Sequence, residues 1–146
     1  MKALLRLAYS LVALVLISTV HAQTAPTDFS TLMGRTRQQL QPLFPGASNE
    51  VPNWNGFATL YLFFNANQKL NQVGASFAAP VSEDDAIKAV RERLGIDTSR
   101  AKPVRAPAAV RFESVSPAIK TVTLKRAYPQ STIEEITITY TLGYNQ

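Results

Sequence analysis

The last strand-like run of the chain constrains the fold more than any other segment. From Ile136 to Leu142 an apolar or aromatic residue alternates with a threonine at every step. A two-residue period is typical of an antiparallel strand that buries one face and exposes the other to water. We therefore expect a sheet with one packed face and one wet face.

Two segments carry helix signals. Thr36 and Gln39 match a capping box, which predicts a short helix over residues 37–44 that Pro45-Gly46 ends. Ser82 precedes acidic residues and an apolar stripe at helical spacing, and Gly95 stands where a left-handed cap would close the helix. A second helix is expected between Ser82 and Gly95.

Five segments read as strands: residues 57–64, 70–77, 109–115, 120–127 and 133–142. The first two are joined by five turn-type residues and predict a hairpin. The expected fold class is α+β, with one antiparallel sheet of about five strands, two helices packed on one face, and the order α-β-β-α-β-β-β.

The N-terminus predicts export. Lys2 and Arg6 precede an apolar stretch and a small-residue cleavage site at Ala22, so residues 1–22 read as a cleavable signal peptide. Residues 23–27 then form a flexible lead, and 28–146 a single small domain, which also divides into two αββ-like halves, 28–79 and 82–146. The expected location is the periplasm or the outside of the cell, with no membrane span after cleavage.

The mature chain lacks the side chains that most catalytic sites use. The sequence has no cysteine, and its one histidine, His21, lies in the predicted signal. Without thiolate or imidazole there is no Ser-His-Asp triad, cysteine nucleophile or ordinary zinc site, and without a cysteine after Ala22 there is no lipid anchor. We therefore expect no catalytic residues, no metal and no cofactor.

Residues 29–77 resemble a known module. The resemblance rests on the run from Leu32 to Leu40, on Pro45-Gly46, on Trp54 and on the run from Tyr61 to Leu70. These segments are similar to the helix-then-hairpin unit of SmpA/BamE-type outer-membrane assembly lipoproteins, and secreted β-lactamase inhibitor proteins have a related arrangement. The chain departs from that family in lacking the lipid-bearing cysteine and in carrying Asn67-Gln68 where Asp-Gly is usual. The resemblance implies a periplasmic protein-binding module.

Two groups of residues are candidate binding sites. The aromatic residues Trp54, Phe57, Tyr61 and Phe63 either anchor a partner or pack in the core of a two-sided strand, and Trp54 is the one most expected at the surface. The cations between residues 88 and 111 form either an anion-binding patch or an ordinary solvated face. Its members are Lys88, Arg91, Arg93, Arg100, Lys102, Arg105 and Arg111.

Adjacent acids do not predict catalysis here. Asp84-Asp85 is explained by helix capping, and the neighbours Glu134-Glu135 would point to opposite faces of a strand. The sequence thus predicts an exported, non-enzymatic binding module that engages a protein partner or an anionic envelope surface, and not genomic nucleic acid. The alternatives are a small secreted enzyme using carboxylate or Ser/Lys chemistry, and an inhibitor of a secreted enzyme.

Overall fold

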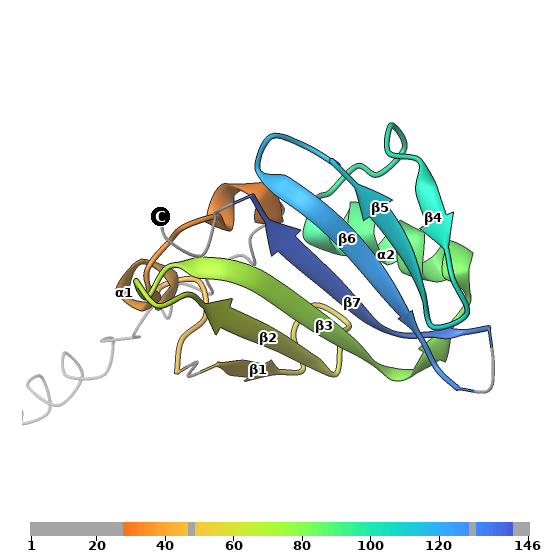
Figure 1. The fold of residues 1–146 in the computed structure, drawn as a ribbon. Coiled ribbons are helices and arrows are strands. Elements are labelled where there is room, and N and C mark those ends of the chain that lie inside the picture. The colour runs from red at the N-terminus through yellow and green to blue at the C-terminus, as the bar shows by residue number, and fades with distance from the viewer. Residues whose placement is uncertain (1–27, 47–48, 129–130, 142–146) are drawn as a thin grey trace, which may run out of the picture.

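One antiparallel sheet of seven strands organises the computed structural model, which describes residues 28–46, 49–128 and 131–141 (Figure 1). The strand order is β1-β2-β3-β7-β6-β5-β4, so two meanders meet where β3 pairs with β7. The strands are β1 Glu50–Pro52, β2 Thr59–Phe64, β3 Leu70–Val81, β4 Pro103–Arg105, β5 Ala109–Glu113, β6 Ile119–Arg126 and β7 Ile133–Tyr140. The helices are η1 Phe29–Leu32, α1 Arg37–Leu40 and α2 Glu83–Leu94.

The expected fold class, about five strands in the order α-β-β-α-β-β-β, is wrong. The structure is mostly sheet, and its two additional strands, β1 and β4, form the two edges. Each is three residues long and contains a proline. Short proline-containing segments read as loop or connector, because proline cannot donate to a strand ladder and is found mainly at sheet edges.

The two helix signals are confirmed at their starts. In α2, Ser82 accepts the backbone N–H of Asp85, and Gly95 adopts a left-handed φ of 65° at the C-terminus. In α1, Thr36 and Gln39 form the predicted capping box, but the helix ends at Leu40 instead of residue 44. The predicted signal peptide and lead, residues 1–27, lie outside the described residues.

The predicted hairpin is confirmed as β2 and β3. Its turn depends on Asn65, whose side-chain oxygen accepts the backbone N–H groups of Asn67 and Lys69, each at 3.0 Å. Gln68 takes a left-handed φ of 59°. The turn therefore depends on the buried side chain of Asn65 and on the left-handed backbone of Gln68.

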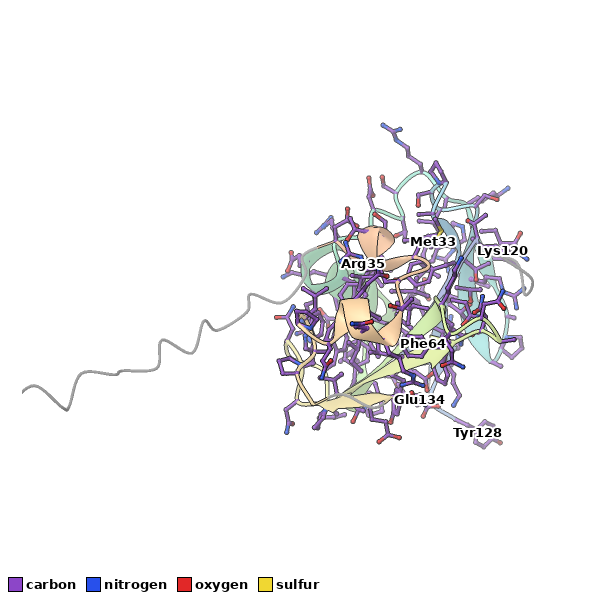
Figure 2. All side chains as sticks on the ribbon, turned by 90° about the vertical axis from the view of Figure 1, so that its left-hand side faces the viewer. Met33, Arg35, Phe64, Lys120, Tyr128 and Glu134 are labelled. Atoms are coloured by element: carbon purple, nitrogen blue, oxygen red, sulfur yellow. The ribbon has the colours of Figure 1, made fainter. Side chains whose placement is uncertain are left out.

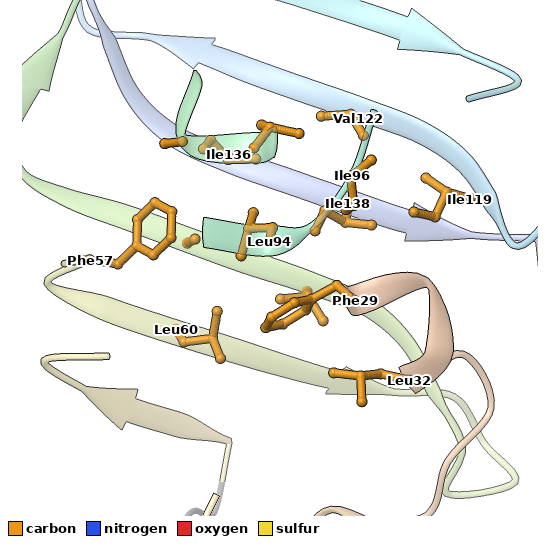
Figure 3. Packing of buried hydrophobic residues seen from close by; sticks show 14 of the residues in the cluster. Phe29, Leu32, Phe57, Leu60, Leu94, Ile96, Ile119, Val122, Ile136 and Ile138 are labelled. Carbon is orange, nitrogen blue, oxygen red and sulfur yellow. The ribbon is translucent and has the colours of Figure 1, made fainter. Parts of the chain in front are cut away.

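The core lies between the helices and one face of the sheet (Figure 3). Ile136 and Ile138 of β7 meet Leu94 of α2 and Phe29 of η1 in this layer. The Tyr140 hydroxyl donates to the Phe29 carbonyl at 2.7 Å, so the buried end of β7 fixes η1 against the sheet. The alternation in β7 thus places its apolar residues inward, and the helices leave the opposite face of the sheet open.

Candidate functional site

The open face of the sheet is assembled by cross-strand register. Residues directly opposite in antiparallel strands carry their side chains on the same face. One row across this face is Glu50, Tyr61, Gly74, Thr137, Thr123, Arg111 and Val104. The next row is Phe63, Gln72, Thr139, Thr121 and Glu113. Figure 1 views this face, with α2 behind the strands.

An aromatic pair stands at the β2 side of the open face. The rings of Tyr61 and Phe63 are 6.4 Å apart with an interplanar angle of 26°. Both cover Gly74, since a Cβ at that position would lie 3.5 Å from each side chain. Phe63 nevertheless remains 46% exposed, whereas most large apolar side chains of the described residues are buried.

Trp54 does not belong to this surface. It is only 8% exposed and belongs to the hydrophobic core. Its ring packs edge-on against Phe29 at 5.2 Å and stacks on Phe57 at 6.4 Å. The aromatic residues grouped from the sequence therefore divide, with Trp54 and Phe57 in the core and with Tyr61 and Phe63 on the open face.

The cations of residues 88–111 do not form one patch. Arg105 faces α2 and contacts Glu83 at 2.8 Å, while Arg111 lies on the open face, 3.8 Å from Glu113. Arg93 donates to the Gly56 carbonyl at 2.9 Å. Successive side chains of a strand point to opposite faces of the sheet. Arg105 of β4 is therefore on the face opposite to Arg111 of β5, although the two residues are close in sequence.

Arg100 and Lys102 precede β4 and are exposed. Within the described part of the chain, neither makes a hydrogen bond or an ion pair. Arg100 lines a pocket at the end of α2, apart from Arg105 and Arg111. Arg100, Arg105 and Arg111 thus lie in three different places, at the pocket, on the helix side and on the open face.

Each pair of adjacent acidic residues includes one with a structural role. Asp85 caps α2 together with Ser82, and Glu134 pairs with Lys125 at 3.0 Å. Hydrogen bonds from the backbone and side chain of Ser99 lower the pKa of Asp97, so this carboxylate stays ionised and is unsuited to act as a general acid. Among the described residues no group of three or more His, Cys, Asp or Glu side chains could hold a metal.

Sequence reasoning missed two surface features. Tyr128, 98% exposed, projects from the end of β6 away from the body of the protein (Figure 2). The second feature is Gly74, which Tyr61 and Phe63 cover. It lies on the same face of β3 as Gln72 and Ser76, but the sequence does not show that aromatic side chains lie over it.

Both edges of the sheet are closed by prolines. Leu62 donates to the Asn49 carbonyl and Asn53 to the Ala58 carbonyl, so the alternate positions of β1, including Pro52, direct their backbone outward. Ala106 and Ala109 exchange hydrogen bonds, so the backbone groups of Ala106 and Val104 are directed toward β5. Pro103, three residues before Ala106, therefore directs its backbone outward. A missing N–H at each outer edge disfavours pairing with a further strand.

Across residues 28–46, 49–128 and 131–141, no helix is long and apolar enough to cross a membrane. Comparison of the chain with protein-family models, with curated proteins and with solved structures found no match.

Proposed function

We propose that this chain is an exported, non-enzymatic binding module of the cell envelope that engages a protein partner through the open face of its sheet. One observation carries the proposal, namely the exposure of Phe63 beside Tyr61 on the face opposite the helices. Large aromatic side chains are enriched at the centres of protein interfaces, where they supply much contact area at little entropic cost.

The surroundings of the aromatic pair support a protein partner. Gln72 lies directly opposite Phe63, and the threonines of β7 and then β6 continue the row with neutral hydrogen-bonding groups. Farther across the sheet, Arg111 with Glu113 and Lys125 with Glu134 supply charges of both signs. An apolar centre with a polar, mixed-charge rim is the usual composition of a protein interface.

Two other binding modes have less support. Addition of a strand is disfavoured at both edges by Pro52 and Pro103. An anionic envelope surface would need a concentrated positive patch, whereas Arg105 and Arg126 are both bound to Glu83 on the helix side. With the sheet edges and a positive patch disfavoured, the open face is the surface best suited to bind a partner.

A photocrosslinking experiment tests the proposal. p-Benzoylphenylalanine at position 63 of the exported chain should capture one discrete protein partner in cells. The same probe at Arg91, which is 65% exposed on α2, should not capture it. With the purified partner, Phe63→Ser should lower affinity by about 10- to 30-fold, as expected for a central aromatic anchor.

Three outcomes would overturn the proposal. Equal capture from positions 63 and 91 would mean that the open face is not selective. Unchanged affinity of Phe63→Ser for the captured protein would mean that the aromatic pair is not an anchor. Salt-sensitive binding to anionic vesicles that Phe63→Ser leaves intact and Arg111→Gln weakens would instead indicate a lipid surface.

A further inference from the structure

A half-open pocket lies on the helix side of the molecule, away from the aromatic pair. It is formed where η1, the C-terminal end of α2 and the turn between β5 and β6 meet, and its volume is about 240 Å³. That space corresponds to roughly eight water molecules at about 30 Å³ each. The pocket is therefore large enough to hold a small molecule.

The pocket has an acidic side. Asp28 and Asp97 both line it. One oxygen of Asp28 accepts the backbone N–H and the hydroxyl of Ser30, at 2.9 and 2.6 Å, and its other oxygen has no hydrogen bond from the described residues. The pocket also borders Gly95, which caps the C-terminus of α2, where the helix dipole adds partial negative charge.

The pocket has a cationic group as well. Arg100 lines it, and its guanidinium makes no hydrogen bond or ion pair with the described residues. Arg100 nevertheless lies close enough to Asp97 to lower the pKa of that carboxyl. Arginine presents a planar fork of donors that suits a carboxylate. Ile96, Val115 and Ile119 complete the lining with apolar surface.

We infer that this pocket binds a small zwitterion, a free α-amino acid being the simplest, with its ammonium group toward Asp28 and Asp97 and its carboxylate toward Arg100. A purely anionic ligand would be repelled by the two carboxylates, and a purely cationic one would leave Arg100 unused. A molecule carrying both charges satisfies both sides. This site is independent of the protein interface proposed for the open face.

Titration of the exported chain with three matched probes tests the inference. Alanine carries both charges, propionate lacks the ammonium group, and ethylamine lacks the carboxylate. Alanine should shift the backbone amide resonances of Ile96 and Ser116 and bind at least tenfold more tightly than either analogue.

Variants locate the site. Arg100→Gln should weaken alanine binding at least tenfold without unfolding the chain, because Arg100 makes no described bond within the fold. Asp97→Asn keeps an oxygen to accept the Ser99 N–H and should have a similar effect. Lys88→Gln, on the outer surface of α2, is the matched control and should leave binding unchanged.

Three results would overturn the inference. The first is the absence of shifts at Ile96 and Ser116 as alanine approaches its solubility limit. The second is equal binding of alanine and propionate or of alanine and ethylamine. The third is alanine binding that Arg100→Gln and Lys88→Gln affect alike.

Discussion

Substitution of Glu83 by glutamine should destabilise the protein more than any other loss of a single surface charge on α2. Two arginines converge on this residue. Arg126 contacts one of its oxygens at 3.1 Å and Arg105 the other at 2.8 Å. The side chains of Arg126 and Glu83 are only 15% and 20% exposed, so Glu83→Gln leaves a partly buried guanidinium without its counter-charge.

The expected loss can be estimated from that burial. A hydrogen bond to a charged group contributes about 1.5–3 kcal/mol, and breaking a fully buried pair costs about 3–5 kcal/mol. Because Arg126 keeps a bond of 2.7 Å to the Ser131 carbonyl, the lower range applies. We expect the free energy of unfolding to fall by about 2–3 kcal/mol. With a urea slope of roughly 1.5 kcal/mol per M, the unfolding midpoint then falls by about 1.3–2 M.

Urea denaturation followed by the fluorescence of the buried Trp54 measures this change. The matched control is Glu92→Gln, which removes the same charge from the same helix, at a pair whose side chains are 65% and 53% exposed. That control should change stability by less than about 0.5 kcal/mol. Equal midpoints for the two variants would refute the argument that burial of Arg126 makes the Glu83 contact strong.

Two further substitutions have matched controls. Tyr140→Phe removes a hydroxyl that donates to a buried carbonyl and should lower the free energy of unfolding by about 1–3 kcal/mol, against less than about 0.5 for Tyr61→Phe in the same urea assay. Burial raises the pKa of the Tyr140 phenol above its unfolded value of about 10, so the stability that the neutral phenol contributes is lost as pH rises above about 10. If the free energy of unfolding of the wild type fell no more steeply with pH than that of Tyr140→Phe, this expectation would be contradicted. Gly56→Ala would place a Cβ 2.9 Å from Arg93 Nη1, whereas Gly46→Ala meets open space at a similar φ. Arg93 would then have to give up its bond to the Gly56 carbonyl or its position over the Phe57 ring, so Gly56→Ala should cost about 1–2 kcal/mol more than Gly46→Ala. Equal thermal midpoints would show that the arginine side chain moves aside without losing these contacts.

Local signals made much of the secondary structure predictable. The α2 helix is specified by Ser82 at one end and Gly95 at the other, both of which act within one helical turn. The strand β7 is specified by its alternation, which needs no knowledge of its neighbours. The edge strands β1 and β4 could not be recognised, because each has three residues and its extended conformation depends on the strand beside it.

The candidate site was less predictable, because its membership depends on tertiary position. Trp54 lies in a polar loop, which makes it the aromatic residue most expected at the surface, but the structure packs it against Phe29 and Phe57. Arg105 and Arg111 are close in sequence but lie on opposite faces of the sheet. Composition cannot reveal which of two faces a residue occupies in a short strand that was itself not expected.

Most side chains on the open face can be explained by the stability of the sheet. Threonine on a wet strand is explained by stability alone, since a β-branched side chain favours the extended backbone and tolerates water. Tyr61 is likewise explained, because it stands directly opposite Gly74 and covers it. Phe63 stands opposite Gln72 and reaches Gly74 only with the edge of its ring. A threonine at position 63 would meet the same structural needs, so the exposed phenylalanine is the aromatic residue of this face that the sheet alone does not explain, and the proposed partner would explain it.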